Sequence, residues 1–565
     1  MKQKIIGILL LTVLMAIGAS VQAQERQGEA GKNHNLEVGK SLDILNNVYR
    51  NLDLFYVDTL NPQQTVTAAI KGMMHSLDPY TDYYPEEDAK NLQQMITGKY
   101  AGIGSLVKYH QALKRVVIDE PYAGMPAAEA GLKKGDIVLS IDDSVMTDKQ
   151  VGDVSSRLRG DAGTSFVLRV KRPSTGKEMK FKITRRNIKL PELTYYGILE
   201  GTEGKVGYIN LNQFTEGCAK NVRNALIELK QQGATKLVFD LRGNGGGSEM
   251  EAVDIVSLWV PKDQMVVENR GKVRQASRTY RTRLEPIDTV MPLVVLVNGE
   301  TASASEITSG ALQDLDRAVI IGTRTYGKGL VQVPMELPYN ANVKITTSKY
   351  YIPSGRCIQA INYKRDGQGG YKERIADSLT QVFHTKGGRE VRDGGGIKPD
   401  IEIKADSLPN IAYYLSSGLD STEVLFDYVV DYIARHPSIG DDPTQFHLTD
   451  ADYEAFCQRV VKSGFKYNLL SKRHFDELVR AAKSEGYYDE ARETFDALEQ
   501  KLHNDVGADL QKHRAIIQQI LELDIIAAYH YQAGALRAGL QYDRQLKEAL
   551  RLLAEPEEYQ RLLKP

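Results

Sequence analysis

One serine-rich turn and one lysine are the residues of this sequence that could perform covalent chemistry. Residues 298–306 read NGETASASE and follow the apolar stretch 293–297, which is typical of a strand. A hydroxyl at a turn between a strand and a helix lies near unpaired backbone N–H groups, and these stabilise developing negative charge. Ser303 or Ser305 could therefore be a nucleophile. A serine that only caps the helix is the more common explanation of such a turn.

A nucleophilic serine needs a base, and histidine is the usual partner. All ten histidines lie outside residues 111–383, and the sequence has no G-x-S-x-G motif. Lysine is a known substitute. Lys328 lies in 322–332, GTRTYGKGLVQ, which is not a phosphate-binding loop because Gly329 stands where Ser or Thr would hold Mg²⁺. Apolar neighbours could lower the lysine pKa from about 10.4, although a surface lysine in a glycine turn has the same pattern.

The composition is that of a folded chain without an obvious charged partner. Hydrophobic residues make up 42%, charged residues 26%, and the net charge is −1. No basic run favours nucleic acid or an anionic membrane. The three cysteines, Cys218, Cys357 and Cys457, are far apart and predict neither a disulfide framework nor a zinc site. We expect no metal, cofactor or nucleotide.

The first 23 residues have the layout of a secretory signal peptide. Two lysines precede an apolar run over 5–17, and small residues lead to Ala23, where cleavage is plausible. The run is short for a bilayer span of about 20 residues, and a retained anchor is the alternative. We therefore expect an exported protein of the periplasm or cell envelope.

The rest of the chain has four regions with different residue patterns. Residues 24–99 have helical periodicity, and 100–187 consist of short β-branched runs separated by glycines. Residues 188–404 alternate strand-like runs with helical stretches at 216–231, 249–259 and 303–313, which predicts a largely parallel sheet. Residues 405–565 are rich in helical patterns, including one continuous stretch over 510–555. The pattern predicts an α/β multidomain protein.

Several motifs in order carry a resemblance to a known family. They are SLDPYT, KYAGIG, AEAGLKKGDIVLSID, DLRGNGGG, NGETASASEITSGALQD, GTRTYGKGLVQ, YYIPSGRCIQ and GGGIKPDIEI. Together they resemble the carboxyl-terminal processing proteases, the tail-specific serine peptidases of the S41 type. The resemblance implies a crotonase/ClpP-like α/β protease core over 188–404, an inserted PDZ domain over 100–187, a helical N-terminal region and a helical C-terminal extension.

The resemblance also implies roles for four residues around the serine turn. Ser303 matches the family nucleophile and Lys328 its general base, 25 positions later. Gln332 matches the residue that orients the lysine. Glu306 matches a family acid one helical turn from the serine. It is either a helper in the site or a first-turn carboxylate that interacts with the helix dipole.

Two glycine-containing turns complete the expected sites. The family oxyanion hole uses the N–H after the nucleophile, here of Ala304, and one from the turn 240–247, where Gly246 is our choice. This turn has Gly245 where relatives have proline. In the PDZ domain, Gly102-Ile103-Gly104 matches the loop that captures a peptide carboxylate, with the isoleucine lining the pocket for the last side chain. A plain loop is the alternative.

The resemblance implies an exported serine endopeptidase that cleaves unstructured C-terminal tails of envelope proteins. A catalytically inactive PDZ scaffold that only binds peptides is the main alternative, and a nucleotide hydrolase lacks the Mg²⁺-binding hydroxyl. Cys357 stands where relatives have serine and is a minor candidate nucleophile. Expected partners are proteins or peptides with free C-terminal tails, and self-association would use the helical regions.

Overall fold

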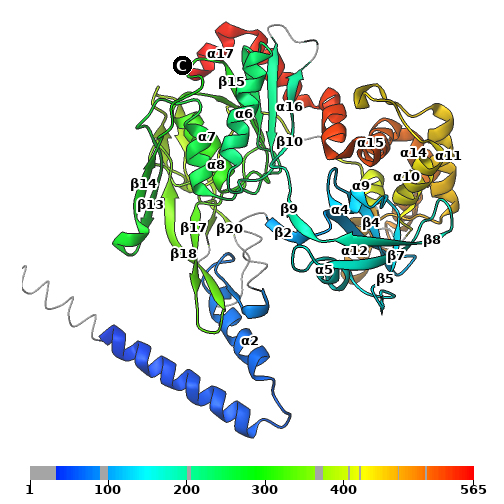
Figure 1. Ribbon diagram of the computed structural model, residues 1–565, viewed down its shortest axis with the longest axis horizontal. Helices are drawn as coiled ribbons and strands as arrows, with labels where there is room; N and C mark the ends of the chain where they lie inside the picture. Colours follow the sequence, from blue (N-terminus) through cyan, green and yellow to red (C-terminus); the bar gives the residue numbers. More distant parts are fainter. Residues whose placement is uncertain are drawn as a thin grey trace, which may run out of the picture. The chain divides into compact units, whose positions relative to one another are not determined.

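The computed structural model describes residues 33–88, 99–199, 201, 205–362, 373–404, 407–418, 422–468, 470–502 and 505–564. The signal-peptide prediction for 1–23 lies outside these residues. The chain divides into two compact units, 1–85 and 86–565 (Figure 1). In the described ranges no helix is both long and apolar enough to cross a membrane.

The first unit is helical over most of its described length. It contains a helix over 33–55 and helix α2 (Pro62–His75). Helix α2 begins where its residue types predict, because Asn61 accepts a hydrogen bond from the Gln64 N–H and Pro62 occupies the first helical position. No residue of α2 is buried.

A β-rich domain opens the second unit. Strand β2 (Lys99–Gly102) pairs with β9 (Arg186–Lys189). A second, antiparallel sheet has the order β3-β4-β5-β7-β8, with β6 paired to β5. Its strands are β3 (Ser105–His110), β4 (Arg115–Pro121), β5 (Ile137–Ile141), β6 (Ser144–Val145), β7 (Ser165–Lys171) and β8 (Glu178–Thr184). Helices α4 (Pro126–Glu129) and α5 (Val151–Leu158) complete this domain, and β3 is an edge strand.

The expected parallel sheet forms the centre of the region 188–404. Its order is β10-β11-β12-β15-β16-β23, parallel throughout except for the antiparallel edge pair β10–β11. The strands are β10 (Leu193–Leu199), β11 (Val206–Leu211), β12 (Lys236–Asp240), β15 (Leu293–Val297), β16 (Val319–Gly322) and β23 (Ile401–Glu402). The prediction of strand–helix alternation is confirmed, with helices α6 (Cys218–Gln231), α7 (Glu249–Val256) and α8 (Ala304–Asp314) between strands.

The two faces of this sheet are covered by different parts of the chain. Alternate strand residues such as Ile209 and Val295 pack against α6, α7 and α8. Their neighbours, such as Tyr208 and Val294, pack against α16 (Arg544–Ala554) and α17 (Pro556–Leu563), which are red in Figure 1. Strands buried on both faces read as continuous apolar runs, as β15 does.

A smaller antiparallel sheet lies beside the central one. The long strand β18 (Asn342–Tyr351) pairs with β17 (Leu330–Glu336) on one side and β13 (Met265–Gly271) on the other, and β13 also pairs with β14 (Arg278–Arg281). The sequence pattern placed 342–351 in the same alternation as the parallel strands. Strand β18 belongs to this separate sheet because its partners are its own hairpin neighbour β17 and β13.

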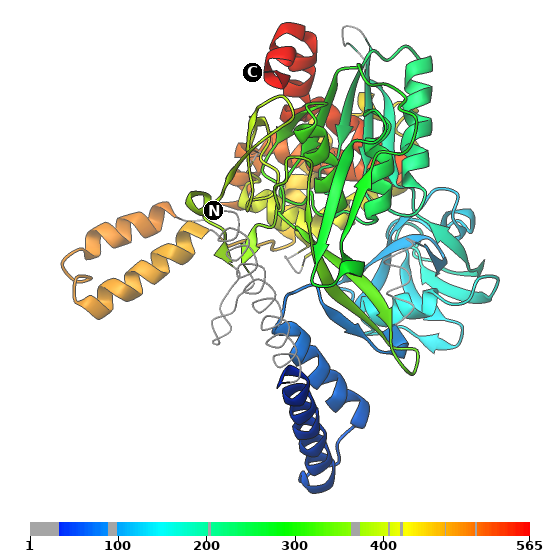
Figure 2. The same ribbon diagram turned by 90° about the vertical axis from the view of Figure 1, so that its left-hand side faces the viewer.

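The C-terminal region forms a helical bundle. It contains α9 (Asn410–Ser417), α10 (Val424–Arg435), α11 (Asp450–Lys462), α14 (Val506–Lys512) and α15 (Arg514–Gly539), which share one apolar core. Helices α12 (Leu470–Glu485) and α13 (Arg492–Lys501) form a hairpin that extends away from it (orange in Figure 2). The stretch 510–555, expected to be helical, is divided at His513 and Asp543, and α15 is kinked at Tyr531, whose backbone is non-helical.

Candidate active site

The serine turn connects β15 to α8 and has an unusual backbone conformation. Ser303 stands at the N-cap of α8 with φ 57° and ψ −117°. A non-glycine residue with positive φ costs of order 1–3 kcal/mol and persists only where the surroundings enforce it. Such strain is found preferentially at functional sites. The conformation of Ser303 therefore favours a functional role over that of a simple helix cap.

Burial separates the two candidate serines. Ser305 is fully buried, and its hydroxyl donates a hydrogen bond to the Asn244 carbonyl oxygen at 2.9 Å. Ser303 is only half-buried. Because a nucleophile must reach the substrate, the structure favours Ser303 over Ser305.

Glu306 joins the serine turn to the lysine loop. It is fully buried, and its carboxylate accepts hydrogen bonds from the backbone N–H of Ser303 (2.9 Å), Gly327 (2.7 Å) and Lys328 (2.9 Å) and from the Thr325 hydroxyl. Burial raises the pKa of Glu306 to about 7, against the opposing effect of these donors. Glu306 is in the first turn of α8 and also connects the two loops, so both readings of this carboxylate stay open.

Tyr350 makes a second connection, which the sequence did not reveal. This buried tyrosine lies on β18, and its hydroxyl donates to the Lys328 carbonyl oxygen and lies 3.3 Å from the Ser303 carbonyl oxygen. Its only signal was its place within YYIPSGRCIQ, one of the motifs that carried the resemblance. Periodicity marks it as a strand residue and says nothing about its two partners.

Lys328 lies in the loop between β16 and β17 and is half-buried. The loop packs tightly on residues 359–360, because a Cβ on Gly327 would lie 2.2 Å from the Ala360 Cβ and one on Gly329 would lie 2.8 Å from the Gln359 nitrogen. Gln332 is on β17, and its amide donates to the Thr346 hydroxyl at 3.2 Å. The orienting role of Gln332 toward the lysine stays a prediction.

The glycine turn 240–247 contacts the serine turn directly. A Cβ on Gly246 would lie 2.8 Å from the Ser303 Cβ and 2.9 Å from the Ala304 nitrogen, so only glycine fits. The Gly246 N–H, our choice for the second oxyanion donor, donates to Asn244 Oδ1 at 2.9 Å in this structure. Gly246 is thus beside Ser303, while its N–H has another acceptor.

Asn244 holds this turn in place, and sequence reasoning missed it. Its side chain is fully buried and also donates to the Leu211 carbonyl oxygen at 2.8 Å. Its own carbonyl oxygen accepts from the Ala302 N–H at 3.0 Å and from the Ser305 hydroxyl. Asn244 therefore ties the turn both to the sheet and to the serine turn.

The three residues of the expected carboxylate loop of the PDZ domain have different environments in the structure. Gly104 has φ 67°, and a Cβ there would lie 2.5 Å from the Met125 Cβ, so glycine is required. Gly102 ends β2. The Ile103 side chain is 3% exposed and packs in the core of this domain, and its role in lining the peptide pocket stays a prediction. Its backbone remains beside α4, because the Ala127 N–H donates to the Ile103 carbonyl oxygen.

The cysteines offer no competing site. Cys218, Cys357 and Cys457 are free thiols. Burial raises the pKa of the Cys357 thiol, which disfavours the thiolate needed for nucleophilic attack. Within the ranges described, no three His, Cys, Asp or Glu side chains are grouped so that they could hold a metal ion.

Comparisons with known proteins agree on one family. The models for peptidase family S41, a PDZ domain and a probable PDZ-protease C-terminal helical domain match residues 205–367, 117–172 and 415–553. The carboxy-terminal-processing protease of Bartonella bacilliformis is 32% identical over 427 residues, 73% of this chain and 94% of the relative. The carboxyl-terminal-processing protease of Synechocystis is 36% identical over 307 residues, 54% of this chain and 71% of that protein.

Among solved structures, the photosystem II D1 C-terminal processing protease has 27% sequence identity to this chain and a TM-score of 0.36. The match covers 64% of this chain and 87% of that protein. The chain belongs to the carboxy-terminal-processing proteases, serine proteases of family S41.

Proposed function

We propose that this protein is an exported serine endopeptidase that cleaves unstructured C-terminal tails of envelope proteins, with Ser303 as nucleophile and Lys328 as general base. The observation that carries this proposal is the Glu306 carboxylate, which accepts from the backbone N–H of both residues. One buried group thus holds together two loops that are 25 positions apart. A protein that only binds peptides has no need of this connection.

The chemistry follows from a neutral lysine amine. Lys328 takes the proton of the Ser303 hydroxyl as its oxygen attacks the scissile carbonyl carbon, and the resulting ammonium then protonates the leaving amine. An acyl-enzyme remains, and a water that loses its proton to Lys328 releases it. A lysine pKa near 7 requires a decrease of about 3 units, which corresponds to roughly 4 kcal/mol.

The oxyanion formed during attack needs two donors. The Ala304 N–H is at the N-terminus of α8, where the helix dipole also favours negative charge. The second donor comes from the turn that contains Gly246. Because the Gly246 N–H donates to Asn244 in this structure, its use requires the peptide to turn from Asn244 toward the substrate.

Substrate recognition is assigned to the PDZ domain. Strand β3 is at the edge of its sheet, where an extended peptide can add as a further strand. The backbone of Gly102, Ile103 and Gly104 would capture the terminal carboxylate.

The remaining parts of the proposal rest on the sequence and the family. They are a crotonase/ClpP-like topology for the core, and export directed by residues 1–23. Self-association would use the helix over 33–55, whose apolar residues Val38, Leu42, Leu45 and Leu52 are exposed. Their spacing is that of a helix that packs against another helix.

The test uses a loosely folded protein with a free C-terminus, incubated with wild type, Ser303→Ala, Lys328→Ala and Gln332→Ala and analysed by mass spectrometry. We expect fragments with wild type only, or with Gln332→Ala at a reduced rate. Cleavage by Lys328→Ala at the wild-type rate would exclude the dyad. No cleavage by wild type, together with binding of tail peptides, would favour the inactive scaffold.

A further inference from the structure

The glycine turn beside Ser303 is held from outside by the C-terminal helices. Arg242 lies in this turn, four residues before Gly246, and its side chain is 18% exposed. Its guanidinium donates to both oxygens of Asp240, at 2.9 and 3.1 Å from Nε. On its other side it donates to Asp543 and, at 3.0 Å, to Gln545 Oε1. Asp543 and Gln545 begin helix α16, 300 residues later in the chain.

Asp543 uses its two carboxylate oxygens for two separate tasks. Oδ1 accepts from the Leu546 N–H at 3.0 Å and thereby caps α16. Oδ2 accepts from Arg242. The Asp543 side chain is 16% exposed, so this ion pair is shielded from water more than a surface pair is.

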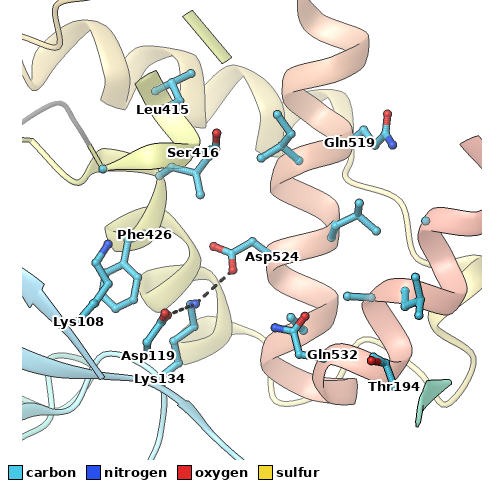
Figure 3. Close-up of a pocket in the computed structure, with 18 of the residues that line it drawn as sticks. Lys108, Asp119, Lys134, Thr194, Leu415, Ser416, Phe426, Gln519, Asp524 and Gln532 are labelled. Atoms are coloured by element: carbon cyan, nitrogen blue, oxygen red, sulfur yellow. Dashed lines mark hydrogen bonds and ion pairs between the residues drawn. The ribbon is translucent and has the colours of Figure 1, made fainter. Parts of the chain in front are cut away.

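The same aspartate lines a cavity of about 700 Å³ at the junction of the three domains. Figure 3 shows the side of the cavity where Lys134 lies between two aspartates. Lys134 and Asp119 are both part of the PDZ domain, where Asp119 is on β4, and Asp524 is on α15. Asp543 and Asp524 therefore line one cavity and have different partners. The first binds the glycine turn, and the second binds the PDZ domain.

We propose that Asp543 is a positioning residue for the oxyanion turn, so that the C-terminal helical domain takes part in transition-state stabilisation through Arg242. This inference rests on the proposed function, because it assumes that Ser303 is the nucleophile and that the turn supplies an oxyanion donor. An Arg242 that is held on both sides fixes the direction of the chain between Asp240 and Gly246. Small misplacements at such a site reduce the rate strongly, by up to about a hundredfold for about 1 Å.

The test is Asp543→Asn, which retains an oxygen to cap α16 and replaces the Arg242 acceptor by an NH₂ donor. The readouts are kcat, KM and the inhibition constant of a peptide aldehyde, whose tetrahedral adduct carries the oxyanion. We expect kcat to decrease about tenfold and the aldehyde to bind about tenfold more weakly, with KM within twofold. The Asp543→Asn and Arg242→Gln effects should be strongly non-additive in the double variant.

Two matched controls separate positioning from a general structural role. Asp505→Asn changes another aspartate cap of the same domain, whose contact is the Ala508 N–H. Asp524→Asn weakens the contact with Lys134 and does not touch Arg242. We expect both to leave the aldehyde inhibition constant within twofold of wild type. If Asp543→Asn does not fold, Gln545→Met provides the test, with an expected decrease in kcat of about threefold.

The proposal is overturned if Asp543→Asn matches Asp505→Asn in kcat and aldehyde binding, or if only its KM changes. Ser303→Ala distinguishes a failure of the proposed function from a failure of the proposed role of Asp543. Cleavage that persists in Ser303→Ala contradicts the proposed function. Loss of cleavage in Ser303→Ala with a normal Asp543→Asn contradicts only the role of Asp543.

Discussion

The two faces of the central sheet are equally buried, but the helices that cover them come from different parts of the chain. One face packs against α6, α7 and α8, which are connections between the strands they cover. The other face packs against α16 and α17, at least 140 residues beyond the last strand of the sheet, β23. On the first face each helix follows its strand, so local sequence predicts the packing.

The C-terminal region therefore has two parts with different structural roles. Helices α16 and α17 bury Val294, Leu296 and Ile321 under their own Leu552 and Leu563. The Tyr559 hydroxyl bonds both the N–H and the carbonyl oxygen of Leu293. The last helices therefore complete the protease core, whereas the α12–α13 hairpin is an addition to the bundle.

The largest expected effect comes from uncovering the distal face. Truncation after residue 540 removes α16 and α17 and exposes a continuous apolar surface, so we expect insoluble protein. Replacement of α12 and α13 by a short Gly/Ser linker should leave the sheet covered and the protein soluble. Soluble yield and circular dichroism measure both. A folded truncated protein would contradict the view that these helices belong to the core.

Single leucines on each face test whether the two faces contribute equally. Leu312 in α8 and Leu552 in α16 are both fully buried. Substitution of either by alanine should lower the free energy of unfolding by about 2–5 kcal/mol. The single tryptophan, Trp259, is buried in the first face and reports core unfolding by its fluorescence in urea. An effect of Leu552→Ala below about 1 kcal/mol would show that the second face is loosely packed.

Glu306 gives the first face a pH dependence. Its pKa is about 7 in the folded protein against 4.5 as the ordinary value, so the native state holds a proton that the unfolded state loses between these pH values. The free energy of unfolding should therefore decrease by about 3 kcal/mol as pH rises from about 4.5 to 7, relative to Glu306→Gln. Urea unfolding of both proteins across this range measures it. Parallel pH profiles would refute the assignment.

The smallest expected effect concerns the second face. Tyr559→Phe removes the hydroxyl that satisfies the buried Leu293 backbone and should cost about 1–2 kcal/mol by Trp259 fluorescence. Tyr453→Phe is the matched control, because its hydroxyl donates to the Leu510 carbonyl oxygen within the helical bundle. We expect this control to leave the Trp259 transition unchanged. Equal effects of both variants would indicate that bundle and core unfold together.

The site was predicted as far as its residue types and order in the chain allow. The motifs indicated Ser303, Lys328 and Gly246, and the structure brings the first two together through Glu306 and places Gly246 against the serine turn. The turn pattern alone left Ser303 and Ser305 open, and the resemblance matched Ser303. In the structure the two differ in burial, and the hydroxyl of the buried Ser305 donates to the Asn244 carbonyl oxygen.

Residues with distant partners were missed or misjudged. Tyr350 and Asn244 act through hydrogen bonds to distant loops, so nothing local marks them. The loop motif of Ile103 did not indicate that its side chain packs in the PDZ core. The break at Asp543 was overlooked because its flanking residues continue a helical pattern.

The sequence by itself indicated the main strands and helices of the core, its largely parallel sheet, and the motifs that carry the family resemblance. Side-chain periodicity and turn residues report local geometry, and these features depend on it. The tertiary structure alone decided what covers the second face, which serine is accessible, and how Glu306 and Asp543 hold the active-site turns. These depend on contacts between residues up to 300 positions apart, whose identity no local pattern contains.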